Sequence, residues 1–376
     1  MEKMYFLDNA STTKPFDEIK DLYEECAQNF YNPSALYDKA VLVRKKIETA
    51  RKNICKYIGG EEGTLYFTAS ATEANNMAIS SVKYHSKELV VSALEHPAVY
   101  EVAKSFQNSG VSVKFLDYTS NGITVEEIKS KVTKNTALVS MMHVSNETGI
   151  INDIKLLTKE IKKINPKIIV HVDGVQAFGK IPVDLMDLGV DMYTLSAHKI
   201  HGLKGVGALW VKNHVNVAPI IYGGGQESGV RSGTENVLGI LAFELAAKKV
   251  SSDVLKNAEI AIRQKQTIID GLNKNNVKYV INGDNCSPYI LSISVDGLRG
   301  EVLVHSLEKY RIYIATGSAC SSKKTENRAL ENLGRTPSQI KGSIRISFSA
   351  YNNYDLTEVA DIIAKEINKI VKTIKG

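Results

Sequence analysis

The chain has few cysteines, and they stand far apart. Only four occur in 376 residues, namely Cys26, Cys55, Cys286 and Cys320. No two of them form a CxxC pair and their spacings match no zinc site, so we expect no bound metal. So few thiols in so long a chain do not make a disulfide scaffold, which favours a reducing compartment and predicts a cytoplasmic protein.

Long apolar runs and dense blocks of one charge are also lacking. No apolar stretch approaches the length of a membrane-spanning helix, and the first residues, MEKMYFLDNA, lack the apolar core of a signal peptide. The net charge is only +6, and no cluster of basic residues is dense enough to indicate nucleic-acid binding. We therefore expect no membrane association and no direct nucleic-acid partner.

Short apolar runs alternate with amphipathic segments through the first two thirds of the chain. Helical patterns lie at 72–85 and 153–164, among other places. Runs rich in β-branched or aromatic residues predict seven strands, at 64–69, 88–94, 111–117, 136–144, 167–173, 191–197 and 207–211. This alternation predicts an α/β fold with a mostly parallel sheet covered on both faces. In such sheets ligands bind beyond the carboxyl ends of the strands.

A second, smaller α/β region is predicted toward the C-terminus. The glycine-rich segment GGGQESGVRSGTENVLGI, at 223–240, leads into a helical stretch. Strands at 289–297 and 343–351 then flank a helix at 300–310. The length of the chain also favours one large domain and one smaller domain.

Three predicted strands are followed closely by polar side chains. Asp173 ends one strand, Lys199 follows another in the segment TLSAHKIHG, and His96 follows a third in SALEHPAV. Taken singly, each has an ordinary interpretation as a helix cap, a solvated loop lysine or a structural histidine. Ser196 and Lys199 also match an SxxK motif of serine hydrolases, but the accompanying SDN and KTG motifs are absent.

Taken together, the three side chains predict pyridoxal 5'-phosphate. This cofactor needs a lysine for a Schiff base, a carboxylate for its ring nitrogen and a flat group stacked on its ring. Ala71 and Thr72 lie at a strand-to-helix junction, where backbone amides and the helix dipole favour a phosphate. Ser196 and His198 can complete the phosphate site, and Gln176 can donate to the phenolic oxygen of the ring.

Ten motifs spread over nearly the whole chain resemble the cysteine desulfurases of the NifS/IscS group, and they occur in that family's order. They are LDNASTT (7–13), NPSALY (32–37), SATEANN (70–76), EHPAV (95–99), SNETG (145–149), HVDGVQAFGKIPVD (171–184), SAHKIHGLKGVGALWV (196–211), GGGQESGVRSGTEN (223–236), GSACSS (317–322) and SIRIS (343–347). The resemblance implies fold-type I of the pyridoxal-phosphate enzymes and a homodimer. It also implies a large cofactor domain at 16–250 and a small domain built from 1–15 and 251–376.

The resemblance also implies roles for individual residues. Lys199 would carry the cofactor and move the Cα proton, Asp173 would pair with the ring nitrogen, and His96 would stack on the ring and act as an acid or base near the substrate sulfur. Asn146 and Arg345 would hold the substrate carboxylate, since the planar guanidinium group of arginine can bind a carboxylate at two points. Asn146 would also be one of the cofactor-binding residues. Thr72, Ser196 and His198 would bind the phosphate, and Thr234 would reach the phosphate of the neighbouring subunit's cofactor. Gly174 departs from the pattern, because alanine is frequent after the cofactor aspartate.

Cys320 stands in the segment GSACSS, which resembles the group of desulfurases with a long, mobile cysteine loop. By resemblance it is the nucleophile that takes the sulfur of L-cysteine as a persulfide and leaves L-alanine. Small neighbours allow the thiol to move, and Lys323 and Lys324 would favour the reactive thiolate. The other three cysteines have no such surroundings and are interpreted as structural.

The sulfur acceptor is expected to be a protein, either an iron–sulfur scaffold or a tRNA-thiolation enzyme. Two alternative activities share the fold and the cofactor, namely a selenocysteine lyase and an aminotransferase. An alternative of another class is a non-catalytic sulfur-relay or assembly partner. Fold resemblance does not separate these functions, and the reactive side chains must do so.

Overall fold

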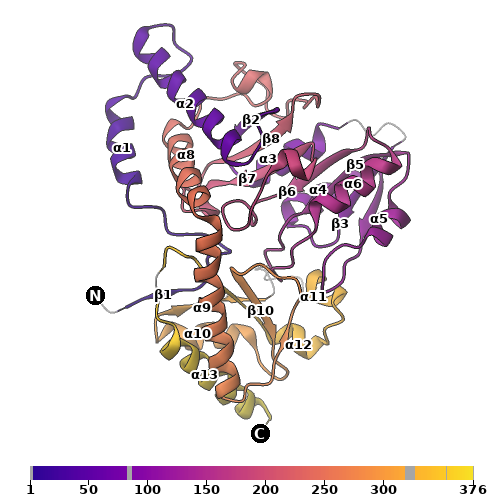
Figure 1. The fold of residues 1–376 in the computed structure, drawn as a ribbon, viewed down its shortest axis with the longest axis vertical. Helices are drawn as coiled ribbons and strands as arrows, with labels where there is room; N and C mark the ends of the chain where they lie inside the picture. The colour runs from indigo at the N-terminus through magenta and orange to yellow at the C-terminus, as the bar shows by residue number, and fades with distance from the viewer. Residues whose placement is uncertain (1–2, 83–86, 318–326, 353, 376) are drawn as a thin grey trace.

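The computed structural model describes residues 3–82, 87–317, 327–352 and 354–375. Figure 1 shows one region built around a large sheet and a second region below it, with the long helices α8 (Val237–Ser252) and α9 (Val254–Lys274) running between them. The N-terminal strand β1 (Tyr5–Phe6) lies with the second region, next to elements from the C-terminal part of the chain. Within these described residues, no helix has both the length and the apolar character needed to cross a membrane.

The large sheet has seven strands in the order β2-β8-β7-β6-β5-β3-β4. They are β2 (Gly63–Thr68), β3 (Glu88–Ser92), β4 (Ser112–Leu116), β5 (Thr136–Met142), β6 (Ile169–Asp173), β7 (Met192–Ser196) and β8 (Gly207–Lys212). Each of the seven predicted strands is present. All neighbouring pairs are parallel except those of β8, which runs antiparallel to both β2 and β7. The prediction of a mostly parallel sheet is therefore confirmed.

Helices bury both faces of this sheet. On one face, α2 (Asp38–Tyr57), α6 (Ile154–Ile164) and α8 pack against alternate strand residues such as Val90 and Val170. On the other face, α3 (Ala71–Ser80) and α4 (Pro97–Asn108) pack against residues of opposite parity such as Leu89. Because both faces are covered, the strands are continuous apolar runs, which is why they could be recognised from sequence.

The second region has its own apolar core. Its sheet has the order β12-β13-β10-β9, and β1 pairs separately with β11. The strands are β9 (Val280–Ile281), β10 (Ile290–Ser294), β11 (Ile312–Tyr313), β12 (Ala315–Thr316) and β13 (Ser343–Ser347). Leu7 is buried in this core among residues from 261 to 370, so the N-terminus packs with the C-terminal part of the chain.

The remaining helices are short or lie at the periphery. They are α1 (Ile19–Gln28), α5 (Val125–Lys131), α7 (Leu185–Leu188), α10 (Gly300–Glu308), α11 (Arg328–Asn332), α12 (Pro337–Lys341), α13 (Thr357–Lys375) and the 3-10 turns η1 (Ala197–Lys199) and η2 (Glu227–Gly229). Side-chain caps fix several helix starts. Thr336, for example, forms a reciprocal capping box with Gln339 at the start of α12.

Candidate active site

Polar side chains from three strands meet at one edge of the large sheet. Asp173 is the last residue of β6 and pairs across the ladder with Met142 of β5 and Thr194 of β7. His96 lies four residues beyond the end of β3, and Lys199 lies three residues beyond the end of β7. The charges of Asp173 and Lys199 both affect the pKa of the His96 imidazole, so the three groups lie within electrostatic reach of one another.

Asp173 is buried, and two donors hold its carboxylate. Its Oδ2 accepts a hydrogen bond from Asn75 Nδ2 at 2.8 Å, and its Oδ1 accepts one from the Val175 N–H at 3.0 Å. Asn75 lies one turn into α3, and its Oδ1 finds no hydrogen-bond partner in the described part of the chain. The two donors fix the orientation of a carboxylate that can pair with a protonated ring nitrogen.

Gly174, next to this aspartate, lies against a buried tyrosine. A Cβ atom at position 174 would lie 1.9 Å from Cε1 of Tyr193. Tyr193 is fully buried, and its hydroxyl is hydrogen-bonded to Nδ1 of His143 at 2.9 Å. The tyrosine ring therefore occupies the volume of the methyl group that alanine would add, so this packing requires glycine at position 174.

The first turn of α3 offers backbone amides at the same edge. Ser70 caps the helix by accepting from the Glu73 N–H at 3.2 Å. Ala71 and Thr72 are the first two helical residues, and N–H groups at these positions have no acceptor within a helix. A Cβ on Gly207 would lie 2.7 Å from the Ala71 nitrogen, so glycine allows β8 to approach this turn closely. The helix dipole adds positive potential, and the turn suits a phosphate group.

Ser196 and His198 lie beside the turn that follows β7. Ser196 is buried, and Nδ1 of His198 lies 3.1 Å from the hydroxyl of Thr12. Burial, followed by the positive charges of Lys199 and Lys204, lowers the pKa of His198 to about 4. The imidazole is therefore neutral at pH 7. Phosphate contacts from these two residues stay a prediction.

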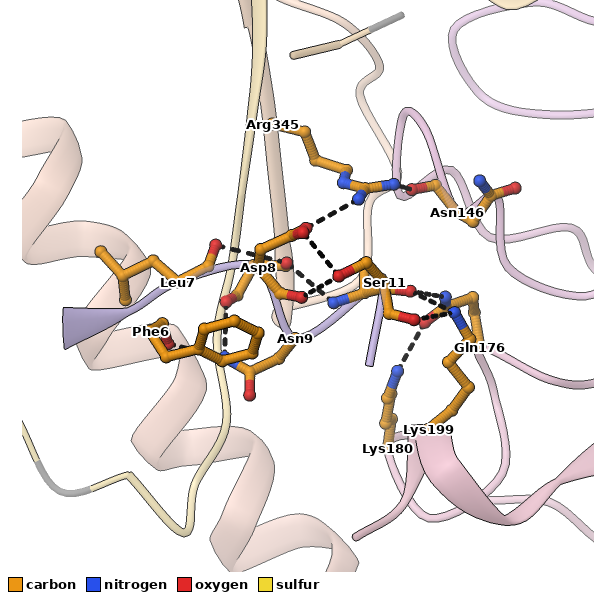
Figure 2. A network of polar contacts seen from close by, with 12 residues as sticks. Phe6, Leu7, Asp8, Asn9, Ser11, Asn146, Gln176, Lys180, Lys199 and Arg345 are labelled. Atoms are coloured by element: carbon orange, nitrogen blue, oxygen red, sulfur yellow. Dashed lines mark hydrogen bonds and ion pairs between the residues drawn. The ribbon is translucent and has the colours of Figure 1, made fainter. Parts of the chain in front are cut away.

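The Lys199 amine is held by backbone carbonyl groups of the N-terminal segment. Its Nζ donates to Ala10 O at 2.7 Å and to Ser11 O at 2.6 Å (Figure 2). Burial, together with the positive charge of Arg345, lowers the pKa of Lys199 to about 8, although two nearby carboxylates oppose this shift. A lysine whose pKa lies this low loses its proton readily, as a nucleophilic or proton-carrying amine requires.

The His96 side chain combines a capping role with a lowered basicity. It is the N-cap of α4, and its Nδ1 accepts from the Ala98 N–H at 3.1 Å. The residue as a whole is exposed. The surrounding protein partly removes the imidazole from water and so lowers its pKa, while Asp173 raises it and the positive charge of Lys199 lowers it further. The net shift is downward, and a neutral imidazole can accept a proton.

Arg345 reaches the same region from β13 in the second region of the molecule. Its Nη1 donates to Asn146 O at 2.7 Å, and its Nη2 forms an ion pair with Asp8 Oδ1 at 2.8 Å (Figure 2). The side chain is buried, and its Nε has no partner among the described residues. Asn146 lies in the loop after β5. The sequence therefore named two residues that the fold brings together across 199 positions.

Gln176 is buried, whereas Thr234 lies in an exposed loop. Gln176 Nε2 donates to Ala10 O at 2.8 Å, and its Oε1 accepts from the buried Lys180 Nζ at 2.5 Å (Figure 2). Thr234 is exposed, in a loop that Arg231 anchors by an ion pair of 2.7 Å with Glu73 of α3. The contacts of Gln176 with a cofactor and of Thr234 with a neighbouring subunit stay predictions.

Cys320 lies in residues 318–326, outside the described residues. The residues on either side of this segment are placed, since Asn327 Nδ2 donates to Gly317 O at 3.1 Å. Ala315, five residues before the cysteine, pairs with Arg345 across the β12–β13 ladder. The last described residues before Cys320 therefore lie beside the strand that supplies Arg345.

Four residues of this region escaped the sequence interpretation. They are Asp8, Asn75, Glu95 and Tyr193. Asn75 carried a usable signal, because it lies four residues after Ala71 and so on the same face of the helix. The other three have no such signal, since their roles depend on contacts between segments far apart in the chain.

Glu95, next to His96, is a buried carboxyl group with no counter-ion contact among the described residues. It is 2% exposed, and neither of its carboxyl oxygens has a hydrogen-bond partner among the residues described. Arg328 lies nearby but stacks over Tyr100, with its guanidinium carbon 3.3 Å from the ring centroid. Burial, and then the charge of Asp173, raises the pKa of Glu95 well above 4.5. The native protein therefore keeps this proton to higher pH than the unfolded chain does.

A Glu95→Gln substitution should stabilise the protein at neutral and alkaline pH. Because the native pKa is raised, the wild-type free energy of unfolding falls as pH rises above 4.5. Glutamine has the same shape and needs no proton, so the variant should gain stability with pH, reaching about 1–3 kcal/mol near pH 8. Urea unfolding at acidic and alkaline pH measures this difference.

Glu227→Gln is the matched control for this substitution. Glu227 is also buried, but it forms an ion pair of 2.6 Å with Arg51 and accepts from the Phe67 N–H at 2.8 Å. The same change should therefore destabilise the protein at this position. If Glu95→Gln were destabilising at alkaline pH as well, Glu95 would be an ionised and paired carboxylate, contrary to our interpretation.

Comparisons with known proteins agree with this geometry. The sequence matches the family described as aminotransferase class-V over residues 4–359. It is 32% identical to a protein named cysteine desulfurase IscS from Clostridium botulinum, over 99% of this chain and 95% of that one. It is 35% identical to cysteine desulfurase IscS 1 from Archaeoglobus fulgidus, over 98% of each chain. A solved structure titled NifS-like protein superposes with a TM-score of 0.89 at 31% identity, covering 99% of this chain and all of that one. The chain therefore belongs to the class-V aminotransferase family and, within it, to the NifS/IscS-like cysteine desulfurases.

Proposed function

We propose that this cysteine desulfurase uses pyridoxal 5'-phosphate, attached to Lys199, to convert L-cysteine to L-alanine and to place the released sulfur on Cys320. One observation carries the proposal. At one edge of the sheet lie a lysine of lowered pKa, a buried aspartate held by two donors, and a buried arginine whose Nε has no partner among the described residues. The lysine would bind the cofactor aldehyde, the aspartate its ring nitrogen and the arginine the substrate carboxylate.

The residues at this edge fit the cofactor. Lys199 would hold its aldehyde carbon, Asp173 its ring nitrogen, and the first turn of α3, with Ala71 and Thr72, its phosphate. The close approach at Gly207 leaves the α3 turn without a side chain that would block a phosphate from that side. When bound, pyridoxal phosphate supplies an electron sink that acidifies the Cα–H bond of the amino acid.

The chain's own side chains then bind the substrate and move its protons. Arg345 and Asn146 hold the α-carboxylate, since the guanidinium group is suited to a planar anion. Lys199, whose pKa is about 8, carries the Cα proton. The neutral His96 accepts the proton of the substrate thiol, which agrees with the direction of its pKa shift.

The sulfur transfer balances without an external oxidant. The Cys320 thiolate attacks the substrate sulfur, an S–S bond forms, and the bond between that sulfur and the substrate Cβ breaks. The electron pair of the broken bond stays on the carbon side, which takes up a proton and becomes the methyl group of L-alanine. The products are L-alanine and a persulfide on Cys320, which together contain all atoms of L-cysteine and the enzyme thiol.

We also propose a homodimer with the domain division 16–250 and 1–15 plus 251–376. Large apolar side chains such as Phe30, Leu36 and Tyr222 are 78%, 92% and 81% exposed. The Phe30 ring stacks on Tyr31, which in turn contacts Tyr37, and a contiguous group of exposed apolar side chains is typical of a surface that another chain covers. Tyr222 directly precedes the loop that contains Thr234, which would put that threonine at the contact between two copies.

The persulfide must be passed to an acceptor. We propose that this is a protein of iron–sulfur cluster assembly or of tRNA thiolation, in a reducing cytoplasm. A persulfide survives only until a thiol attacks its outer sulfur, so the acceptor must present a cysteine thiolate at the enzyme surface.

The proposed reaction is tested by loading the protein with pyridoxal phosphate and measuring alanine and sulfide released from L-cysteine with a reductant present. We expect equal amounts of both products and dependence on added cofactor. Selenide released from selenocysteine but no sulfide from cysteine would favour a selenocysteine lyase. Consumption of a keto acid would favour an aminotransferase. A protein that never takes up the cofactor would favour a non-catalytic relay.

A further inference from the structure

The N-terminal segment crosses the amino-acid site and touches both of its cationic side chains. Asp8 binds Arg345, while the carbonyl groups of Ala10 and Ser11 accept from Lys199 (Figure 2). The segment is held in place from both ends. Leu7 is buried in the second core, and the Thr13 N–H donates to His198 O at 2.9 Å. The Asp8 carboxylate is thus an internal group positioned where an amino acid has to bind.

The Asp8 contact involves a nitrogen of Arg345 that every bidentate binding mode of a carboxylate would use. A two-point grip uses either Nη1 with Nη2, or Nη2 with Nε. Nη1 is engaged by Asn146 O, Nη2 is engaged by Asp8 Oδ1, and Nε is buried with no partner in the described chain. Both possible pairs include Nη2. A substrate carboxylate that binds at two points must therefore share or displace the Asp8 contact.

Resting on the role proposed above for Arg345, we propose that Asp8 lowers the affinity of the site for amino acids by competing with the substrate carboxylate for Arg345. Two carboxylates on one guanidinium repel each other, and this repulsion weakens the binding of every α-carboxylate ligand. The Asp8 carboxylate can move away from Arg345 without losing all its partners. Its side chain is 21% exposed to water, and its Oδ2 accepts a second hydrogen bond from the Ser11 hydroxyl. The free energy with which the wild type binds an amino acid is therefore reduced by the free energy of the Asp8–Arg345 contact.

This proposal and a purely structural role predict opposite effects of Asp8→Asn. If Asp8 competes, the neutral side chain should let L-alanine, the reaction product, bind about tenfold more tightly. The KM for L-cysteine should fall with it, without an increase in kcat. If Asp8 only orients Arg345, the same substitution should weaken the binding of L-alanine and raise the KM for L-cysteine. Asp8→Ser removes the same charge and should act in the same direction, which guards against an effect of the asparagine itself.

The experiment is a calorimetric measurement of L-alanine affinity on the cofactor-loaded protein. Asp17→Asn is the matched control, since Asp17 is also an aspartate near the N-terminus but its side chain is 71% exposed and forms ion pairs with Lys14 and Lys20. It should leave the affinity unchanged. Cysteamine, which lacks the carboxylate, should bind the wild type and the Asp8 variants equally well.

Arg345→Gln separates the inference from the function on which it rests. If Arg345→Gln weakens L-alanine binding and the Asp8 variants tighten it, both stand. If Arg345→Gln weakens it and the Asp8 variants weaken it or leave it unchanged, Asp8 is no competitor, although the proposed carboxylate site stands. If Arg345→Gln has no effect on binding, the proposed carboxylate site is wrong and the competition proposed for Asp8 is overturned with it.

Discussion

A Lys199→Ala variant should lose nearly all turnover of L-cysteine, by about 10²- to 10⁴-fold, the range associated with a positioned proton carrier. The structure gives Lys199 a pKa of about 8 and holds its amine between two backbone carbonyl groups. Alanine has neither the amine that attaches the cofactor nor the base that moves the Cα proton. The absorbance of the covalently attached cofactor should vanish with the activity.

Lys204→Ala is the control for this variant, because Lys204 is an exposed lysine in the same loop. It should keep both the absorbance and the turnover of the wild type. A small primary amine added to Lys199→Ala should restore part of the activity by replacing the missing base. If Lys199→Ala retained the covalent cofactor signal, another lysine would carry the cofactor. Lys180, buried beside Gln176, would be the first to test.

A Cys320→Ala variant should keep its cofactor absorbance but release neither sulfide nor alanine, to below about one hundredth of the wild-type rate, because the nucleophile is gone. Lys199, Asp173 and Arg345 are untouched by the change, so binding of L-cysteine should persist. Measuring both products in the same reaction separates loss of sulfur transfer from loss of substrate binding.

Cys26→Ala is the control that shows whether removing any one cysteine thiol affects turnover. Cys26 lies in α1, and burial together with the charge of Glu25 raises its pKa, which makes its thiolate scarce at neutral pH. This variant should turn over normally. Alanine release from Cys320→Ala at the wild-type rate would show that the sulfur leaves without Cys320, as in a lyase.

The large sheet was predictable because its strands are buried on both faces and so are continuous apolar runs. The same reasoning located Asp173, Lys199 and His96, since residues that follow parallel strands gather at one edge. The two antiparallel pairings of β8 were not predicted from the apolar pattern. A buried strand has the same composition in either direction, and only the chain's path decides the pairing.

The contact between Asp8 and Arg345 and the burial of Glu95 could not be read from sequence. Asp8 meets Arg345 across 337 positions, and a single aspartate near a terminus carries no periodic signal. Glu95 differs from an ordinary loop carboxylate only in its burial, which depends on how several separate segments pack around it. Tyr193 is similar, because the volume that it takes from position 174 follows from the packing of β7 and not from any local motif.

The most direct test of the account is the mass of the peptide that contains Cys320 after the cofactor-loaded enzyme has reacted with L-cysteine in the absence of reductant. We predict that this peptide gains one sulfur atom, that the peptides with Cys26, Cys55 and Cys286 do not, and that alanine forms in equal amount. Alanine formation with no added sulfur on Cys320, or with the sulfur on one of the other three cysteines, would contradict the assignment of Cys320 as the sulfur carrier.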